Sequence, residues 1–418
     1  MPQLVNYLHY IFEYLEDDKA TLFSCLLVNH LWCEVAVNIL WRDGQHCQTG
    51  SIITLIACLP NNKSKEILHN KRIISPVPTS NPPMFNYAAF CKSLSISDIT
   101  QGISYLLNQY YPNDEFCILV GQEIFNLFMN QISSLKYLNI REDGFYINCD
   151  NYLTICPRAK DCLRNLFKLK CVSKTHPELI YQLSQIVHNL ISLSITICAN
   201  DISNELMDLI SAQKYLKHLI IHTIFDLKEI SSTSLSRFPN TITKLTLHGR
   251  CHSHIPLSFI TRFTNLQKLK LSFDRDISED FRKLQYTTFS QLEILRISKT
   301  CSEDEDLINF IETNGKNLKE LCISLLNSLN LAIAKFCPNL RKLSVGFKKD
   351  ELETLNIVFL KCQHLRSIDI HCGGIYLSEK SVLEAVVNYS PKNFYELRLA
   401  YYCQQSSELS SEEWNPFL

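Results

Sequence analysis

The sequence contains few glycines, almost no net charge and no long apolar run. Only 10 of its 418 residues are glycine, which disfavours the glycine-rich loops that cradle phosphates. A formal net charge of -1 gives the whole chain no general attraction for nucleic acid or for an anionic membrane. No stretch reaches the roughly 18 apolar residues that a membrane span needs. The N-terminus also lacks the basic, apolar and small-residue segments of a secretion signal. We therefore expect neither a membrane nor a nucleic-acid partner.

Length and composition favour a folded protein with several units or a repeat array. The 418 residues exceed what one simple core usually holds. Hydrophobic residues make up 46% and charged residues 20%, as in ordinary folded proteins. The 18 cysteines extend from Cys25 to Cys403 without a Cys-x-x-Cys pair, and some, such as Cys322 and Cys337, occupy apolar positions of a repeating pattern. This distribution favours buried reduced thiols in a cytoplasmic or nuclear protein.

The first 42 residues show three helical patterns. Apolar side chains recur at helical spacing over residues 4–15, and Asp17 and Asp18 then interrupt the pattern and can cap a second helix. We expect Asn29 on the apolar side of that second helix, and a third helix that ends at Trp41 and Arg42. The apolar positions of the three helices are Leu4, Leu8, Ile11, Phe12 and Leu15; Leu22, Cys25 and Leu26; and Trp32, Val35, Ala36, Ile39 and Leu40. Three helices in about 40 residues are marginally stable alone, so this unit is expected to need a partner.

Several landmarks in these 42 residues fall in a familiar order. They are Met1-Pro2, the segment Leu-Val-Asn-x-x-Trp-Cys over residues 27–33, and Leu40-Trp41. This pattern resembles the F-box, by which the substrate receptors of Skp–cullin–F-box ubiquitin ligases bind the Skp adaptor. The chain departs from it at Met1-Pro2, where Leu-Pro is usual, and at Asn38, where relatives often have proline. The resemblance implies binding to a Skp-type adaptor and, through it, to a cullin. The contact residues that it implies are Pro2, Leu4, Leu8, Ile11, Phe12, Leu15, Leu22, Cys25, Leu26, Val28, Trp32, Leu40 and Trp41.

The rest of the chain is dominated by one motif, L-x-x-L-x-L with conservative replacements. Between Leu190 and Leu318 successive copies begin about 25 residues apart, within the range of leucine-rich repeats. The last two apolar positions alternate as in a short strand, and segments such as 205–210 and 381–387 between copies look helical. The copies begin at Cys91 (a degenerate one), Leu135, Leu166, Leu190, Leu216, Ile242, Leu266, Leu292, Leu318, Leu340, Leu365 and Phe394. The segment Phe336-Cys337-Pro338-Asn339 resembles the cysteine-containing repeat subtype that often follows an F-box.

These patterns predict an α/β fold: a three-helix F-box followed by a leucine-rich-repeat solenoid with a curved parallel sheet inside and helices outside. The expected divisions are 1–42 for the F-box, 43–88 for a linker and cap region, 89–402 for about 11–12 repeats, and 403–418 for a C-terminal tail or cap. Prolines between positions 76 and 83 favour a stiff extended segment. Residues 103–110 and 122–132 look helical, so the segment between Ile96 and Leu135 holds either an inserted helix pair or a repeat without its motif.

Few groups of residues point to chemistry. His248, Cys251, His252 and His254 follow an expected strand but lack the paired spacing of tetrahedral zinc sites, which favours an exposed turn. The acidic run over 302–306 has a capping-box pattern, which favours a solvated helix cap. Nucleotide-binding loops and the motifs of zinc proteases and serine hydrolases are absent from the sequence. We therefore expect a non-enzymatic protein without catalytic residues, metal or cofactor.

The motif also predicts where a target would bind. In L-x-x-L-x-L-x the third, fifth and seventh positions point away from the core, onto the concave face of the solenoid. Four adjacent repeats place lysine, arginine and histidine at these positions, although the chain is near neutral. We expect this patch to bind an acidic or phosphorylated target segment; the alternative is that its lysines only keep an exposed sheet soluble. The candidate residues are His222, Lys244, His248, Lys268, Lys270 and Arg296.

The two parts together predict a substrate-recognition adaptor of a Skp–cullin–F-box ubiquitin ligase, in which the helices bind the adaptor and the repeats select the protein to be degraded. The alternative is a ligase-independent repeat scaffold or recognition protein. The two differ at the N-terminal helices, because only the first requires them to bind the Skp adaptor.

Overall fold

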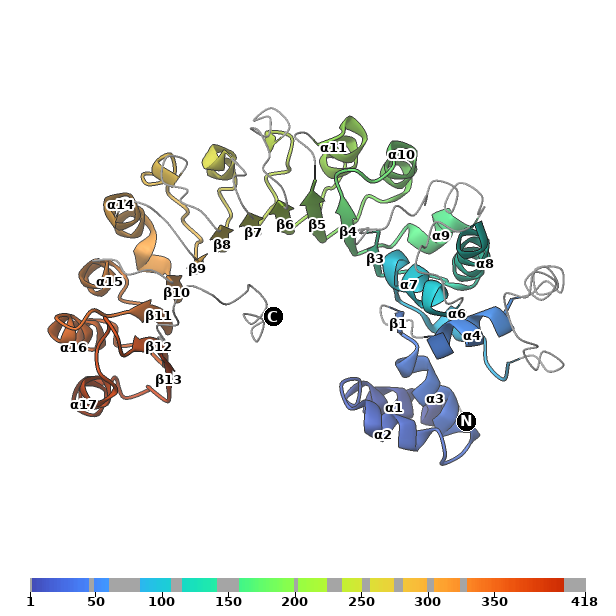
Figure 1. The fold of residues 1–418 in the computed structure, drawn as a ribbon, viewed down its shortest axis with the longest axis horizontal. Coiled ribbons are helices and arrows are strands. Elements are labelled where there is room, and N and C mark those ends of the chain that lie inside the picture. Colours follow the sequence, from blue (N-terminus) through green and yellow to red (C-terminus); the bar gives the residue numbers. More distant parts are fainter. Residues whose placement is uncertain are drawn as a thin grey trace. The chain divides into compact units, whose positions relative to one another are not determined.

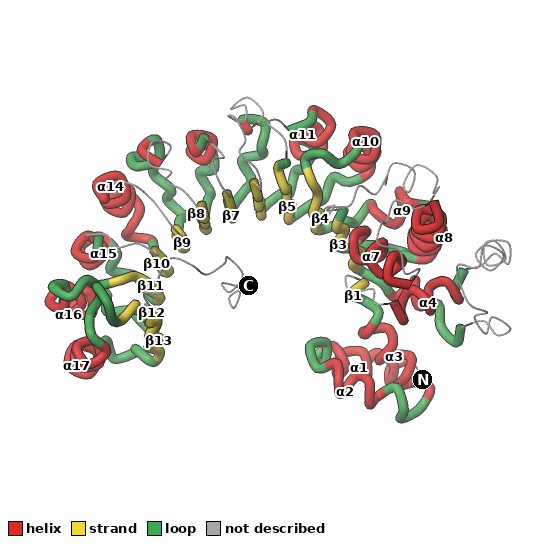
Figure 2. Tube along the Cα trace, in the orientation of Figure 1, coloured by secondary structure: helices red, strands yellow, loops and turns green. Residues whose placement is uncertain are grey.

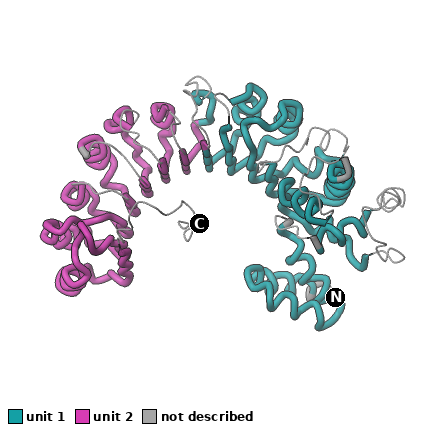
Figure 3. The backbone as a smooth tube through the Cα atoms, viewed as in Figure 1, with its two compact units in different colours: residues 1–222, 233–239 teal, residues 223–232, 240–418 magenta. Residues whose placement is uncertain are grey.

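The computed structural model describes most of the chain in two compact units. The first comprises Met1–His222 with Thr233–Pro239, and the second comprises Thr223–Ser232 with Asn240–Leu418 (Figure 3). The described residues are 2–44, 49–59, 83–106, 115–140, 158–198, 202–223, 235–249, 256–273, 281–298, 304–323 and 329–401. Most of the expected prolines between 76 and 83, and the expected tail 403–418, lie outside these ranges.

The first unit begins with the three expected helices, α1 (Pro2–Glu13), α2 (Lys19–Cys25) and α3 (His30–Leu40). Asp18 caps α2, as expected, because its carboxylate accepts a hydrogen bond from the backbone N–H of Thr21 at 3.0 Å. The expectation for Asn29 was wrong. This residue caps α3, because its side-chain oxygen accepts a hydrogen bond from the Trp32 N–H at 2.9 Å. A short polar amide is more favourable at the start of a helix, where backbone N–H groups lack partners, than on an apolar face.

The three helices enclose a small core of their own. Leu15, Leu26, Leu31, Trp32 and Leu40 pack around its margin. The Trp32 ring meets the Phe12 ring edge-on, with 5.1 Å between centroids. The buried residues of this core are Leu8, Phe12, Leu22, Cys25, Val35, Ala36 and Ile39.

The leucine-rich-repeat pattern is confirmed, because copies of the motif form successive parallel strands. Strand order follows sequence order within each unit. The first unit contains β1 (Asp43–Gly44), β2 (Ser93–Ser95), β3 (Tyr137–Asn139), β4 (Lys168–Val172), β5 (Ser192–Ile197) and β6 (His218–Thr223), whose last residue belongs to the second unit. The second contains β7 (Lys244–Gly249), β8 (Lys268–Phe273), β9 (Ile294–Ser298), β10 (Glu320–Ile323), β11 (Lys342–Gly346), β12 (Ser367–Cys372) and β13 (Glu396–Tyr401).

The sheet begins earlier than the sequence suggested. Asp43 and Gly44 form β1 and pair in parallel with Ser93 and Leu94, so the sheet reaches back into the expected linker 43–88. The expected helices around 103–110 and 122–132 form the pair α7 (Ile96–Leu106) and α8 (Glu115–Gln131) between β2 and β3. The inserted helix pair is therefore the correct alternative for this segment.

Helices cover one face of the sheet in each unit (Figures 1 and 2). We call the opposite face, on which none of these described helices lies, the open face. The remaining helices among the described residues of the first unit are α4 (Thr49–Ala57), α6 (Tyr87–Phe90), α9 (Ala159–Leu163), α10 (Pro177–Ile186) and α11 (Asn204–Ser211). The second unit has α14 (Asp304–Asn314), α15 (Asn330–Phe336), α16 (Leu352–Lys361), α17 (Glu379–Tyr389) and the short 3-10 helices η2 (Leu257–Arg262) and η3 (Gly315–Asn317).

Within each unit, one backbone pattern joins neighbouring repeats. The carbonyl of Glu293 accepts two hydrogen bonds, from the N–H groups of Lys319 at 2.8 Å and Glu320 at 3.0 Å. The carbonyl of Lys319 accepts in the same way from Arg341 and Lys342, at 2.7 and 3.0 Å. The pattern places equivalent motif positions side by side on neighbouring strands, so that motif leucines line up in the core and the intervening residues line up on the open face.

Buried side-chain amides add a second link between repeats. Asn314 accepts from the Phe289 N–H at 2.7 Å and donates to the carbonyls of Thr287 at 2.9 Å and Phe310 at 3.1 Å. Gln213 has the same role in the first unit, where it accepts from the Leu190 N–H and donates to the Val187 carbonyl. In each unit a polar side chain therefore satisfies backbone groups that the turn leaves without a strand partner.

Tyr376 covers one end of the open face. A Cβ at Gly346 would lie 3.1 Å from Cδ1 of Tyr376 and closer still to its Cε1, and the ring centroid of Tyr376 lies 5.5 Å from that of His371. Gly346, an expected open-face position, is therefore buried beneath an aromatic ring.

We expect Gly346→Ala to destabilise the second unit by about 1–3 kcal/mol, the usual range for overpacking, because the added methyl group displaces the Tyr376 ring. Denaturant unfolding of Gly346→Ala, Tyr376→Ala and the double variant measures this. The double variant should lose less stability than the two single losses added together. Strict additivity would show that the ring does not oppose the methyl group.

Candidate interaction surfaces

The N-terminal helices carry a second apolar stripe that faces outward. On α1 and the turn after it, Tyr7, Tyr10, Ile11 and Tyr14 recur at helical spacing and are all exposed, with Tyr14 at 91%. Phe23, Leu27 and Val28, on α2 and the turn that follows it, are also exposed, with Leu27 at 89%. Large apolar side chains grouped in this way on a small unit are typical of a surface that binds a partner.

The structure divides the expected adaptor-contact residues into three groups. Leu8, Phe12, Leu22 and Cys25 are buried in the core of the three helices, so they support the unit's shape rather than its surface. Ile11 and Val28 are exposed and can meet a partner directly. The half-buried residues are Leu15, Leu26, Trp32, Leu40 and Trp41. The side chains of Pro2 and Leu4 lie outside the described residues.

The expected contact residues thus include both residues of the internal core and residues of the surface. The reason is that both stripes of α1 are apolar, and the stripe of leucine and phenylalanine was taken for the contact face. Tyr7, Tyr10 and Tyr14 were not among the expected contact residues, although their spacing with Ile11 indicated an apolar stripe. Trp41 has a further role, because its ring lies 4.7 Å from that of Tyr87 and packs α3 against the start of the repeats.

The open face of the second unit brings together most of the expected target-binding residues. Lys244 on β7 lies opposite Lys268 on β8, and Lys270 lies opposite Arg296 on β9. The buried and partly exposed positions alternate along β8 and β9, as expected. His222 lies on β6 and belongs to the first unit, so the structure does not gather it with the others.

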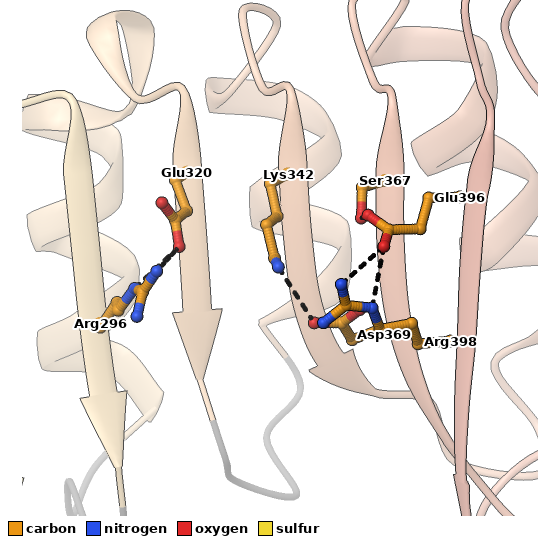
Figure 4. Close-up of polar contacts among 7 residues, drawn as sticks. All are labelled: Arg296, Glu320, Lys342, Ser367, Asp369, Glu396 and Arg398. Atoms are coloured by element: carbon orange, nitrogen blue, oxygen red, sulfur yellow. Dashed lines mark hydrogen bonds and ion pairs between the residues drawn. The ribbon is translucent and has the colours of Figure 1, made fainter. Parts of the chain in front are cut away.

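Arg296, an expected member of the basic patch, is paired with a carboxylate. Its guanidinium donates to Oε1 of Glu320 from Nε at 2.7 Å and lies 2.5 Å from the same oxygen through Nη2 (Figure 4). The sequence placed both residues on the same face but did not show that they would pair diagonally across strands. Glu320 therefore compensates one charge of the expected patch.

The strands beyond Glu320 carry further compensated charges. Lys342 lies 3.6 Å from Asp369, and Arg398 lies 3.9 Å from the same carboxylate (Figure 4). Arg398 also donates to Glu396 at 2.6 Å, and Ser367 donates to Glu396 at 2.7 Å. The hydrogen bond from Ser367, followed by that from Arg398, lowers the pKa of Glu396 and keeps it ionised. This part of the open face is electrostatically paired.

The lysines of β7 and β8 have a different environment. Burial lowers the pKa of Lys268, and the neighbouring Arg296, Lys270 and Lys244 lower it further, while Glu320 acts in the opposite direction. Burial, and then Lys270, lowers the pKa of His248, so this histidine is neutral near pH 7. His248 therefore contributes a hydrogen-bonding group to the surface and not a charge.

The described residues offer no alternative chemical centre. Among them, no three His, Cys, Asp or Glu side chains are grouped so as to hold a metal ion. Cys251, His252 and His254, like Ser302 of the acidic run, lie outside these residues. Most described cysteines are buried, and burial raises the pKa of Cys171 to about 12, which keeps it protonated. No helix in the described part of the chain has the length and apolar character needed to cross a bilayer.

Comparisons with known proteins found similar chains among solved structures. No family model matches it, and no curated protein matches it. Among solved structures it is similar to the leucine-rich-repeat protein LegL7 from Legionella pneumophila, with 16% identity, a TM-score of 0.34, and coverage of 76% of this chain and 88% of that one. It is also similar to a chain of the yeast Rad7–Elc1 complex, with 18% identity, a TM-score of 0.37, and coverage of 56% of this chain and 69% of that one. A chain of the mouse RP105/MD-1 complex is similar with 15% identity, a TM-score of 0.34, and coverage of 67% of this chain and 54% of that one.

Proposed function

We propose that this protein is a non-catalytic adaptor that binds a Skp-type subunit of a cullin ubiquitin ligase through its N-terminal helices and a target protein through its repeats. The observation that carries the proposal is the exposed stripe of Tyr7, Tyr10, Ile11 and Tyr14 beside a complete internal core. A three-helix unit that satisfies its own core has no folding requirement for a second apolar face. A partner explains that face, and the F-box resemblance of residues 1–42 supports a Skp-type adaptor as that partner.

The repeats fit the second half of this proposal. Successive parallel strands expose rows of side chains on the open face. The exposed residues can differ from repeat to repeat without any change in the motif leucines that form the core. Such a surface suits selective binding of another protein. The cysteine that carries ubiquitin and the ligase activity would belong to other subunits.

We expect Tyr10→Asp/Ile11→Asp to weaken binding to a purified Skp-type adaptor at least about tenfold, because interface aromatic residues often contribute 2 kcal/mol or more. Biolayer interferometry with immobilised full-length chain measures the affinity. The matched control is Tyr181→Asp, because Tyr181 on α10 is 52% exposed and Tyr10 is 67% exposed.

The proposal predicts that the native chain and the Tyr181→Asp control bind the adaptor equally well. Circular dichroism must show the same helix content in all variants. If the native chain does not bind the adaptor, the protein is a ligase-independent repeat scaffold and the adaptor role is excluded.

A further inference from the structure

The open face of the second unit separates into a paired part and an unpaired part. From β9 to β13 its charged side chains form ion pairs, namely Arg296 with Glu320, Lys342 with Asp369, and Arg398 with Asp369 and Glu396. On β7 and β8, Lys244, Lys268 and Lys270 have no carboxylate partner among the described residues. We call these three residues the lysine cluster.

The sheet register holds the lysine cluster together. Lys244 and Lys268 are direct partners on adjacent strands, so their Cα atoms are about 5 Å apart. Lys268 and Lys270 are two residues apart on one strand and project from the same face, about 7 Å from each other. Arg296 lies beside Lys270 on the next strand. Four cations therefore gather over three strands, and among the described residues Glu320 is the carboxylate that acts on Lys268 in the opposite direction.

Such crowding is unfavourable in the free protein, because like charges on a partly desolvated surface repel one another. The lowered pKa of Lys268 has this origin in part. An anionic ligand placed over the cluster would be attracted to these cations and would offset the repulsion between them. The same face carries the hydroxyl groups of Thr246, Ser272 and Ser298 next to these cations, and they can donate to anionic oxygens.

We propose that the lysine cluster binds an acidic segment of the target protein, whose carboxylate or phosphate groups lie over β7 and β8. This inference rests on the proposed function, in which the repeats capture a protein. The ion-paired strands β10–β13 mark one limit of the site, because Glu320, Asp369 and Glu396 already compensate the cations there. Glu320 also competes with the ligand for Arg296.

An acidic peptide fits this surface better than a nucleic acid does. Nucleic acid presents a phosphate every few ångströms and needs a continuous cationic track. Here the cationic region covers three strands and is followed at once by carboxylates on β10, β12 and β13. A short cluster beside paired charges is suited to a few anionic groups on one segment.

Fluorescence anisotropy of the full chain with labelled peptides of about eight residues, long enough to cross the cluster, tests the inference. The probes are polyglutamate, polyglutamine, and polyglutamine with one central phosphoserine. We expect polyglutamate to bind and polyglutamine not to bind. The affinity for polyglutamate should fall at least about fivefold between 50 and 300 mM NaCl as charges become screened. The phosphoserine probe shows whether one phosphate can replace several carboxylates.

The variants make the test specific. Lys268→Gln/Lys270→Gln should weaken polyglutamate binding about tenfold or more, whereas Glu320→Gln should strengthen it by releasing Arg296. The matched control is Lys342→Gln, because Lys342 holds the same motif position as Lys268 on the same face but is paired with Asp369. This control should change affinity less than about twofold, in keeping with the small contribution of exposed ion pairs.

Three results would overturn the inference: polyglutamate binds no better than polyglutamine, Lys342→Gln weakens binding as much as the cluster variant does, or a single-stranded oligonucleotide of equal charge displaces polyglutamate at lower concentration. Adaptor binding by the N-terminal helices is measured separately. If the adaptor binds while polyglutamate does not, the proposed adaptor role stands and only the acidic-segment site is lost.

Discussion

Replacing Phe12 with alanine is expected to unfold the three N-terminal helices while the strands of the second unit remain folded. Phe12 is 1% exposed and packs against Trp32 in the centre of a core formed by seven buried residues. Truncating a buried phenylalanine costs about 3–5 kcal/mol. A unit of about 40 residues seldom has more than about 3–5 kcal/mol of stability, so the expected loss is close to the total stability of the three helices.

Hydrogen exchange measured by mass spectrometry distinguishes this local unfolding from a global one. Amides of α1, α2 and α3 should lose protection in Phe12→Ala, and those of β7–β13 should keep it. The control is Ile11→Ala, one residue away and 57% exposed, for which a change within about 0.5 kcal/mol is expected. Equal loss of protection in both variants would show that Ile11, too, belongs to the core. Loss throughout the chain would show that the helices and the repeats unfold as one.

Asn314→Ala is the second substitution with a large expected effect. Asn314 is 4% exposed, and its amide makes three hydrogen bonds to the backbone of its own and the preceding repeat. Alanine leaves the Phe289 N–H and the Thr287 carbonyl without these partners. Each unsatisfied buried group costs about 1–3 kcal/mol, so we expect the second unit to lose about 2–5 kcal/mol in denaturant unfolding.

The neighbouring Asn317 provides a matched control for this prediction. Its Nδ2 also donates to a backbone carbonyl of the preceding repeat, that of Ser290 at 2.9 Å, but at an exposed position where water can replace it. Asn317→Ala should therefore change stability by less than about 1 kcal/mol. If the two variants lose the same amount of stability, burial of the Asn314 amide does not account for its contribution to stability.

The repeats were readable from the sequence because a periodic motif repeats the same physical requirement. Leucines at fixed spacing had to share one core, and the order and direction of β4–β13 follow from that spacing. β1 could not be found in this way, since Asp43 and Gly44 carry no apolar motif and join the sheet through backbone pairing alone. Asn29 was misplaced for a related reason: its role is a local hydrogen bond that periodicity does not encode.

The interaction surfaces were only partly readable. The motif identified which residues share the open face, and the register of Lys244, Lys268, Lys270 and Arg296 agrees with it. The diagonal pairing of Arg296 with Glu320 depends on side-chain reach across strands, which no linear pattern specifies. On α1 the helical period predicted an apolar face correctly, but two apolar faces were present. Deciding which is internal required the positions of α2 and α3.

The paired hydrogen bonds that join neighbouring repeats also bear on how the protein is made. Each carbonyl such as that of Glu293 or Lys319 accepts from the repeat that follows it, so within each unit a repeat is attached to the one synthesised just before. At a ribosomal rate of about 5–20 residues per second, one further repeat of about 25 residues emerges every few seconds. Within each unit, nascent chains can therefore extend the sheet one strand at a time from the N-terminal side, with each finished edge serving as the template for the next strand.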